Sequence, residues 1–413
     1  MARALEGIRV LDLSHVLAGP TTTLHLADLG AEVIHIEPPQ GDDAREFGPF
    51  VGPTDKNHSG YFISLNRNKK GMVLNLRHPR GKGLFQELLE VSDVVVENYR
   101  PGTLKKLGFD WEEMQGINPA IIYCSISGYG HDSLPEYRKR PSYDIIAQAF
   151  SGIMSITGPE GGKPCRIGNS MGDIIAGTHA VVGILAALIH RGRTGRGQCV
   201  DISMVDSLFS TLENAIVRYT ALGEIAGPLG DKHPTITPFQ GYETKDSWIV
   251  AAIGTDNLFA NLCNAMQLPS LSEYECFKTN PLRTQNRNAL NATLGPVFKE
   301  KSTAEWCQIL DKAGIPYSPI NNLEQICNDA HIQSRNMLVE IDQPMVGKMR
   351  IANSAIHLSE TPGEVYAPAP ILGQHSEEIL TEILGYRQHA VEQLKQEGII
   401  NDCRIPLSEA ADF

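Results

Sequence analysis

Hydrophobic and polar residues follow two alternating patterns over the first 130 residues. Short apolar runs typical of buried strands lie at residues 9–13, 34–37, 94–96 and 121–126. Helical patterns separate them, at residues 21–29, with Gly30 where a helix often ends, and at residues 83–90. Strands that alternate with helices favour a parallel sheet with helices on both faces. The pattern therefore predicts an α/β fold.

The longest apolar run, residues 174–189, is interrupted by Thr178 and His179. It is too short to span a bilayer comfortably, so we expect a buried helix and no membrane association. The first fourteen residues show no charged leader before a long apolar core, so no signal peptide is expected.

The pattern changes after about residue 220. Glycine and proline gather at residues 227–238, which we interpret as a linker, and a smaller α+β unit follows at residues 242–322. Proline-rich loops then lead into two final helices, at residues 377–384 and 390–397. Periodicity alone leaves open whether this last part returns to the first domain.

Composition narrows the function classes. A chain of 413 residues with 42% hydrophobic and 20% charged residues is typical of a globular protein of two domains. The net charge of −12 argues against nucleic acid as a partner, although a local basic cluster can still bind an anion. Eight scattered cysteines without a CxxC pair favour free thiols in a reducing cytoplasm. The thirteen histidines lack HxxxH or HExxH spacing, so no metal site is expected.

The first candidate for chemistry is the segment LDLSHVLAGP at residues 11–20, with Glu37 ending the next strand. This layout imitates a dinucleotide-binding fold, but the turn contains only Gly19 and not G-x-G-x-x-G, so a nicotinamide or flavin cofactor is not expected. A structural turn fixed by Gly19-Pro20 and a ligand-binding loop remain about equally favoured. His15 alone is more often a packing residue than a catalyst.

Basic residues form the second candidate. They are Arg67, Lys69, Lys70, Arg77 and Arg80 in one group, and Arg100, Lys105 and Lys106, next to Asn98 and Tyr99, in another. Loops at the carboxyl ends of parallel strands bind ligands, so two basic loops there could neutralise a phosphate while a tyrosine stacks on a base. Charge alone favours ordinary solvated side chains.

The third candidate is Asp173, in the glycine-rich turn GNSMGDIIAG before the long apolar helix. Pattern alone favours a helix N-cap. An aspartate of ordinary pKa is also ionised at neutral pH, so it can attack a thioester without a base, and nearby backbone N–H groups can hold the resulting oxyanion. Tyr143-Asp144 precedes another apolar helix, and a cap is again the default interpretation.

Taken together, these segments resemble one family. LEGIRVLDLSHVLAGP, LADLGAEVIHIEPPQGDDAR, SLNRNKKGMVLNL, VVVENYRPGTLKKLGFDW, YCSISGYG, RPSYDIIAQAFSGIMSITG and GDIIAG look like the motifs of the family III CoA-transferases, the CaiB/BaiF group, in the same order. Later segments (KTNPLR, AGIPYSPINNL and ILGQH) continue the match, so the resemblance covers nearly the whole chain.

The resemblance implies a fold and an activity. It implies a large Rossmann-like domain built from residues 1–220 and 326–413, a smaller domain at 221–325, and an interlocked homodimer. It implies transfer of CoA from a short acyl-CoA (formyl-, acetyl- or succinyl-CoA) to a small carboxylic or dicarboxylic acid such as oxalate or succinate. The CoA thioester is then a substrate, and no tightly bound cofactor is expected.

The resemblance also implies site residues. The nucleophile of the family falls on Asp173, which would form an aspartyl intermediate. The expected CoA-binding positions are His15, Leu17, Ala18, Leu74, Asn75, Leu76, Arg77, Asn98, Tyr99, Arg100, Lys106, Arg140 and Tyr143.

Two departures bear on the substrate. Formyl-CoA transferases of this type carry glutamine where this chain has Leu17, and they carry a run of glycines that is not found between residues 237 and 254. The chain is therefore more similar to members that act on oxalate with acetyl-CoA, or on succinate- and glutarate-type acids.

Two other functions stay open. An α-methylacyl-CoA racemase shares this fold and needs paired acid–base groups, but such racemases have histidine where this chain has Tyr143. A non-catalytic acyl-CoA-binding protein would bind CoA esters without exchange, and the intact Asp173 speaks against it.

Overall fold

The computed structural model describes residues 3–53 and 58–401 of the chain. The chain divides into two compact units. The first contains the described residues of Met1–Ile153, Ile167–Ile216 and His331–Phe413, and the second contains Met154–Arg166 and Val217–Ala330. The sequence placed these boundaries at residues 220/221 and 325/326.

The segment Met154–Arg166 joins the second unit through contacts distant in sequence. The N–H of Gly230 donates to the carbonyl of Gly158 (2.8 Å), and Lys232 pairs with Glu160. No local pattern reveals such contacts, so sequence reasoning assigned this segment to the first domain.

The first unit is built on a six-stranded sheet in which every neighbouring pair is parallel, as predicted. Its order is β5-β2-β1-β6-β7-β8. The chain adds β2 and β5 on one side of β1 and then β6, β7 and β8 on the other, so the strand order reverses, at a topological switch point, between β1 and β6. The strands are β1 (Arg9–Asp12), β2 (Glu32–Glu37), β5 (Lys69–Val73), β6 (Val94–Glu97), β7 (Ile122–Ser127) and β8 (Cys199–Ser203).

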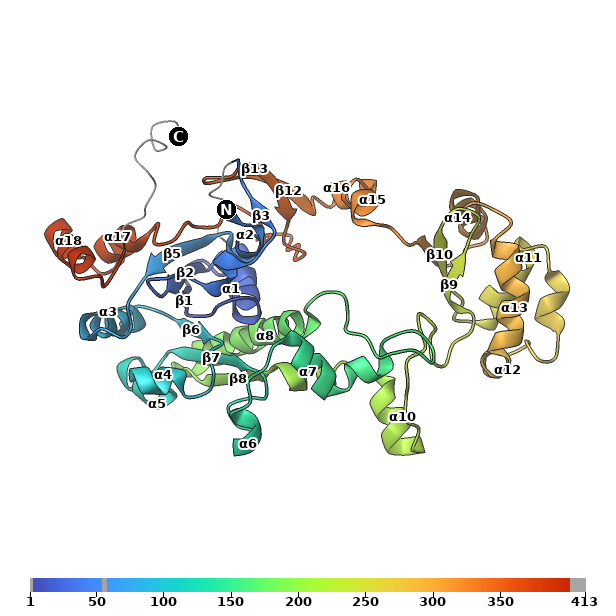
Figure 1. Ribbon diagram of the computed structural model, residues 1–413, viewed down its shortest axis with the longest axis horizontal. Helices are drawn as coiled ribbons and strands as arrows, with labels where there is room; N and C mark the ends of the chain where they lie inside the picture. Colours follow the sequence, from blue (N-terminus) through green and yellow to red (C-terminus); the bar gives the residue numbers. More distant parts are fainter. Residues whose placement is uncertain (1–2, 54–57, 402–413) are drawn as a thin grey trace. The chain divides into compact units, whose positions relative to one another are not determined.

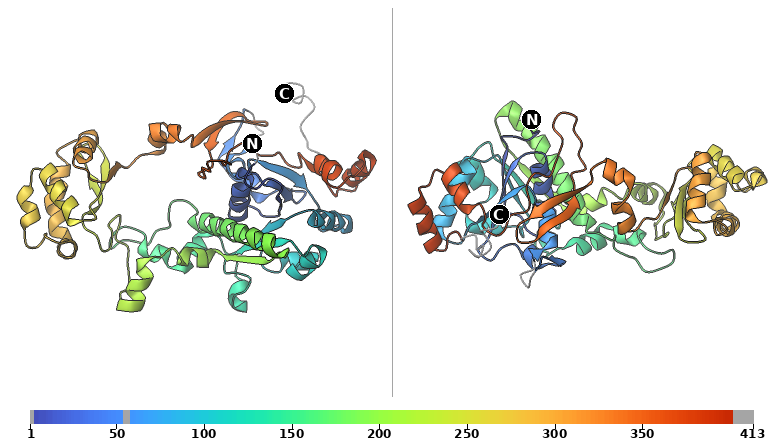
Figure 2. Two further views of the ribbon diagram at one scale, coloured as in Figure 1. Left: turned by 180° about the vertical axis from the view of Figure 1, so that it is seen from behind. Right: turned by 90° about the horizontal axis from the view of Figure 1, so that it is seen from above.

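Helices cover both faces of this sheet (Figures 1 and 2). Because side chains alternate along a strand, Val10 and Leu11 enter different cores. Val10 packs in the core with α1 (Ala18–Asp28), α7 (Asp144–Ser151), α8 (Met171–Thr194) and α9 (Met204–Phe209). Leu11 packs in the core with α3 (Pro79–Glu90), α4 (Thr103–Leu107), α5 (Trp111–Ile117), the π-helix Ile379–Ile383 and α18 (Gln388–Gln396).

The C-terminal part returns to the first unit at the β5 edge. The backbone N–H of Gly71 donates to Nδ1 of His375 (3.0 Å), and that of Val73 donates to Oγ of Ser376, the first residue of α17 (Ser376–Glu378). A hairpin of β12 (Leu338–Gln343) and β13 (Gly347–Ala352) precedes it and packs with Phe62 of α2 (Gly60–Asn66). The chain ends therefore build one unit around one sheet.

The long helix α8 is long and apolar enough to cross a bilayer by length and composition alone. In the structure it lies against α1, α9, β7 and β8. Ala176, Ala180 and Ile184 are buried in this contact, as predicted, whereas Val182 and Ile189 are about 60% exposed (61% and 60%).

The second unit has its own core around a three-stranded antiparallel sheet of order β11-β10-β9. In that core the rings of Tyr242 and Phe298 stack with their centroids 4.3 Å apart, and Trp306 packs at a tilt against Phe298. Its elements are β9 (Phe239–Glu243), β10 (Trp248–Ala252), β11 (Tyr317–Pro319), α11 (Asp256–Ala265), α12 (Asn280–Gln285), α13 (Arg287–Phe298), α14 (Thr303–Lys312) and α15 (Leu323–Cys327).

Candidate active site

A pocket of about 650 Å³ lies at the carboxyl ends of four strands of the first unit. It is lined by the loops that follow β1, β2, β5 and β6, on both sides of the switch point, which is where open α/β sheets bind ligands. Of the residues expected to bind CoA, seven line it: His15, Leu74, Asn75, Leu76, Arg77, Tyr99 and Lys106.

The pocket wall carries two cations, Arg77 and Lys106, beside three carboxylates, Glu37, Asp42 and Asp43. Arg77 and Lys106 are exposed and form no ion pair with any residue of the described part of the chain. The acidic wall is partly neutralised, because Arg45 makes two hydrogen bonds of 2.7 Å to the carboxylate of Glu37. Burial alone would raise the pKa of Glu37, but Arg45 holds it below its ordinary value. The pocket can therefore hold phosphate groups at Arg77 and Lys106.

The other basic residues of the first group do not belong to this pocket. Arg67 and Lys69 precede β5 or begin it, so they lie at the amino end of the sheet. Both are buried, and they pair with Asp28 (2.6 Å) and Asp12 (3.1 Å). Lys70 pairs with Glu32 and Glu378, and Arg80 pairs with Glu397. These four basic side chains are thus engaged by carboxylates, and of the first group only Arg77 lines the pocket.

Two pocket loops are clamped together by Asn98. Its Oδ1 accepts the N–H of His15 (2.9 Å) and its Nδ2 donates to the carbonyl of His15 (2.8 Å), so the side chain imitates a strand partner. The rings of His15 and Tyr99 meet edge to face at 5.4 Å. The N–H of Tyr99 donates to the buried carboxylate of Glu97 (2.7 Å). Asn98 is thus used to position the loops.

Asp173 lies in the first turn of α8 but does not cap it. The residue before the helix is Ser170, whose side chain makes no capping bond. The cap comes from Asp144, whose buried carboxylate accepts the N–H of Gly172 (2.8 Å) and the Nε2 of Gln148 (2.8 Å). Asp144 therefore caps α8 and not its own helix, and the carboxylate of Asp173 is left for chemistry.

The environment of Asp173 differs from the expected one. Burial, together with the nearby charge of Asp144, raises the pKa of Asp173 from its ordinary value of 3.8 to about 7. The assumption of an ordinary pKa is therefore wrong. Burial, together with the charges of Asp173, Asp42 and Asp144, raises the pKa of the Tyr61 phenol of α2 to about 12.

The loop between His15 and α1 runs from the pocket to the place where α1 meets α8. Leu17 precedes α1, and Ala18 begins it. A Cβ on Gly177 would lie 2.8 Å from the carbonyl oxygen of Ala18, so α1 and α8 touch there. Gly177 is one turn after Asp173, about 6 Å along the helix. The two ends of this loop thus reach the pocket and the first turns of α8.

Six of the expected CoA-binding residues do not line the pocket: Leu17, Ala18 and Asn98, described above, and Arg100, Arg140 and Tyr143. Arg100, Arg140 and Tyr143 are all exposed, and Tyr143 is 76% exposed at the start of α7. The guanidinium of Arg140 lies over the ring of Tyr137, 4.3 Å from its centroid.

The first unit therefore combines a pocket that can hold phosphate groups with the half-buried carboxylate of Asp173, which is not part of the pocket lining. The sequence profile described as CoA-transferase family III matches residues 5–376. The chain belongs to this family.

Two relatives illustrate what this CoA-transferase is similar to. It is 41% identical to the succinyl-CoA:glutarate CoA-transferase of Mus musculus over 96% of this chain and 90% of the relative. It is 40% identical to the acetyl-CoA:oxalate CoA-transferase of Acetobacter aceti over 81% of this chain and 85% of the relative. The crystal structure of a CAIB/BAIF family protein from Brucella suis superposes with a TM-score of 0.82 at 35% identity, covering 93% of this chain and 100% of that one. The resemblance seen in the sequence is confirmed.

Sequence reasoning missed three residues of this CoA-transferase. Asp42 lines the pocket and bonds the loop after His15, Glu97 bonds the loop that carries Tyr99, and Tyr61 lies near Asp173. Asp42 and Glu97 belong to the family-like segments GDDAR and VVVENYR. Their positions, in the loop after one strand and at the end of another, could have marked them as candidates. Tyr61 offered none.

Proposed function

We propose that this family III CoA-transferase moves CoA from a short acyl-CoA to a dicarboxylic acid, with Asp173 as the covalent nucleophile. The observation that carries this proposal is the half-buried Asp173 carboxylate, left unused by helix capping in α8, which α1 contacts at the end of a loop from a pocket that can hold phosphate groups. The relatives named for glutarate and oxalate support a dicarboxylic acceptor.

The first half of the reaction uses the donor thioester. The Asp173 carboxylate attacks the thioester carbonyl, the C–S bond breaks, and a mixed anhydride and CoA thiolate form. The thiolate then attacks the aspartyl carbonyl of the anhydride, which gives an aspartyl-CoA thioester and releases the donor acid as its carboxylate.

The second half repeats these steps in reverse order with the acceptor. A carboxylate of the acceptor attacks the aspartyl thioester and releases thiolate with formation of a new anhydride. Thiolate attacks the acceptor carbonyl, so the new acyl-CoA leaves and Asp173 is restored. Charge and atoms balance without any added cofactor.

Backbone donors at the start of α1 suit the developing oxyanion. The N–H groups of Ala18 and Gly19 donate to no acceptor within the described residues, as is usual for a first helical turn without a side-chain cap. Since Ala18 lies beside α8 one turn after Asp173, these donors and the helix dipole would stabilise negative charge on a carbonyl held there.

The experiment compares Asp173 variants during turnover. Asp173→Ala should lower exchange of CoA between succinyl-CoA and glutarate by about 10³-fold or more, because an activated nucleophile acts as a unit with its site. Hydroxylamine added to the wild type during turnover should convert Asp173 to a hydroxamate detectable by peptide mass spectrometry. Exchange that persists in Asp173→Ala would exclude this mechanism.

The racemase alternative makes a different prediction. Proton transfer at the α-carbon would place deuterium from solvent into the acyl-CoA without any acceptor acid. CoA transfer requires the acceptor and leaves the α-carbon hydrogens in place. Incubation of an acyl-CoA in heavy water, with and without a dicarboxylate, separates the two reactions.

We also propose that the chain forms a homodimer. On the first unit, α7 and α8 expose large apolar side chains, namely Ile145, Ile146, Phe150, Val182 and Ile189, each between 44% and 61% exposed. Exposed apolar residues in this number are typical of a surface that another protein covers. A second copy is the occupant that the family resemblance favours.

A further inference from the structure

One residue between the pocket and Asp173 has an unusual backbone. Val16 has φ = +64°, in the left-handed region that β-branched residues rarely adopt. It lies between His15, which lines the pocket, and Leu17, which precedes α1. Backbone strain of this kind persists only where surrounding contacts impose it, and it gathers at functional sites.

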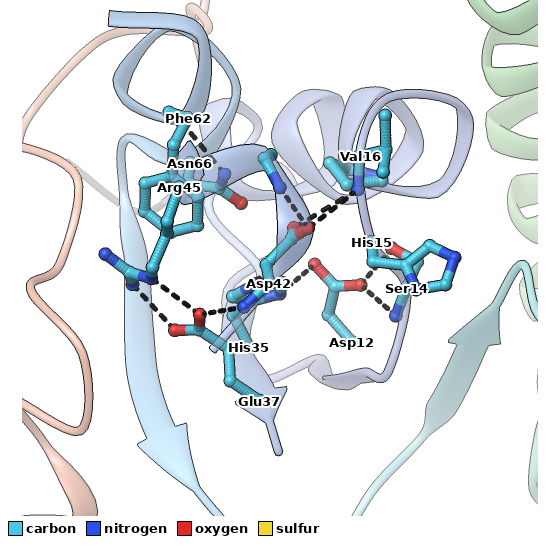
Figure 3. A network of polar contacts seen from close by, with 12 residues as sticks. Asp12, Ser14, His15, Val16, His35, Glu37, Asp42, Arg45, Phe62 and Asn66 are labelled. Carbon is cyan, nitrogen blue, oxygen red and sulfur yellow. Dashed lines mark hydrogen bonds and ion pairs between the residues drawn. The ribbon is translucent and has the colours of Figure 1, made fainter. Parts of the chain in front are cut away.

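Asp42 supplies the contact that imposes it. Both carboxylate oxygens of Asp42 accept the N–H of Val16, at 3.1 and 3.2 Å, and Oδ1 also accepts the N–H of Ala44 at 2.9 Å. Figure 3 shows this carboxylate facing the N–H of Val16. Asp42 is only 4% exposed, so water does not compete strongly for these donors.

A buried polar network fixes where Asp42 lies. The wholly buried His35 stands between two aspartates, with Nε2 3.9 Å from Oδ2 of Asp42 and Nδ1 3.1 Å from Oδ2 of Asp12. Lys69 pairs with the same oxygen of Asp12, and Lys69 and His35 hold the pKa of Asp12 well below its ordinary value although burial opposes them. The N–H of Asp42 donates to Glu37 (2.9 Å). Asp42 is thus located through both its backbone and its side chain.

We propose that Asp42 is a positioning residue for the CoA site. It holds Val16 in the left-handed conformation, and thereby sets His15 against the bound CoA and Ala18 beside the first turns of α8. This inference rests on the proposed function, since it assumes that CoA occupies the pocket.

The first test is Asp42→Asn, with CoA binding to the full-length protein measured by calorimetry. Asparagine keeps the shape, but its Nδ2 cannot accept an N–H, so the two-oxygen contact with the N–H of Val16 is reduced to one uncharged oxygen, which Val16 shares with Ala44. We expect the dissociation constant of CoA to rise about 10- to 100-fold. An effect of charge alone would lower the dissociation constant, because removing a negative charge beside a polyanion should tighten CoA binding.

The neighbouring Asp43 supplies the matched control. It lines the same pocket and is exposed, but it makes no hydrogen bond to Val16. Asp43→Asn therefore reports the charge effect by itself, and we expect CoA to bind up to about fivefold more tightly. Weaker binding in Asp42→Asn and tighter binding in Asp43→Asn separate positioning from charge.

The decisive variant is Val16→Gly, because glycine adopts positive φ without strain. If Asp42 acts by holding Val16, the double variant Asp42→Asn/Val16→Gly should bind CoA within about threefold of Val16→Gly alone. If Asp42→Asn does not fold, Asp42→Ser, which can still cap Ala44, takes its place in the same cycle.

Two outcomes would overturn the inference while the proposed function stands. One is a wild-type dissociation constant in Asp42→Asn, and the other is a loss of binding that Val16→Gly does not suppress, which would mean that Asp42 contacts CoA directly. A wild type that does not bind CoA would instead refute the proposed function, and this inference with it.

Discussion

At the scale of single residues, Asp173 combines reactivity with a cost in stability. Its pKa is raised to about 7 by burial and by Asp144, so its charged form is less stable in the folded protein than in the unfolded chain. This cost in folding stability is largest above pH 7 and decreases as the pH falls from 7 toward 4. The shift corresponds to about 4 kcal/mol as an upper value.

Asp173→Asn should therefore stabilise the protein while it abolishes exchange. We expect a free energy of unfolding about 2–4 kcal/mol higher than that of the wild type at pH 8, and only about 1 kcal/mol higher at pH 4.5, because the folded wild-type carboxyl is then protonated while the unfolded one is still largely ionised. Denaturant unfolding at the two pH values measures this. A gain that is the same at both would show that the charge of Asp173 is not its cause.

Asp144 affects Asp173 in two ways that pH separates. Its charge raises the pKa of Asp173, and its carboxylate bonds the N–H of Gly172. In the wild type, exchange should rise with pH through about 7 as Asp173 ionises. Asp144→Asn should move this rise to lower pH, because the repulsion is removed, and lower the plateau rate about tenfold, because the cap is weakened. A pH–rate profile that does not move would contradict the coupling.

Arg77 and Lys106 should act on CoA alone. Arg77→Ala should raise the KM for the acyl-CoA about tenfold and leave the KM for the acceptor acid unchanged, because a charge-assisted hydrogen bond to phosphate contributes about 1.5–3 kcal/mol. Arg80→Ala is the control, since Arg80 is already paired with Glu397. Equal effects of the two variants on the KM for the acyl-CoA would refute a phosphate role for Arg77.

At the scale of elements, the loop between β1 and α1 depends on the close approach of Gly19 to Ser14. A Cβ there would lie 2.1 Å from the Cβ of Ser14, so the loop after β1 folds back onto the first turn of α1. This explains why α1 begins at Ala18 and includes Gly19-Pro20, whereas the pattern predicted a start at residue 21. Proline is well accommodated in a first helical turn.

Gly19→Ala should lower the free energy of unfolding by about 1–3 kcal/mol through this overlap and weaken CoA binding. The matched control is Gly83→Ala in α3, where an added Cβ meets no atom within 4 Å. Alanine there should stabilise the helix by up to about 1 kcal/mol. Thermal unfolding of both variants measures the two changes in stability. A Gly19→Ala variant as stable as the wild type would contradict close packing between Gly19 and Ser14.

Sequence patterns predicted the elements but not every contact between them. The four strands and the helix at α8 follow from apolar periodicity, because a buried strand or helix must carry its own apolar residues. The ion pairs Arg67–Asp28 and Lys69–Asp12 join positions 39 and 57 residues apart, so the sequence does not reveal which basic residues are neutralised. For the same reason Asp144 was expected to cap its own helix and not α8.

At the scale of the whole molecule, local patterns left the return of the chain end to the first unit open. Its anchors, Gly71 with His375 and Val73 with Ser376, are hydrogen bonds about 300 residues apart in sequence. The family resemblance did imply this return, because similarity over the whole chain predicts the arrangement of the whole fold and not only single helices and strands.

The proposed dimer makes a prediction at this scale. Val182→Glu places a charge in the exposed apolar surface of α8, where Val182 is 61% exposed and belongs to neither core of the first unit. We expect the dimer to dissociate at least tenfold more readily, as measured by sedimentation equilibrium. Glu136→Lys in the short helix α6 (Pro135–Arg138), where Glu136 is also exposed, is the charge control. A wild type that sediments as a monomer would exclude the proposal.

The central claim is that the carboxylate of Asp173 itself carries the transfer, and oxygen exchange tests it most directly. In the proposed sequence each turnover returns one oxygen of the acceptor to Asp173. After turnover with glutarate labelled with oxygen-18, the peptide containing Asp173 should carry the heavy isotope, first in one and then in both carboxylate oxygens. An unlabelled peptide after many turnovers would show that Asp173 forms no anhydride with the acceptor.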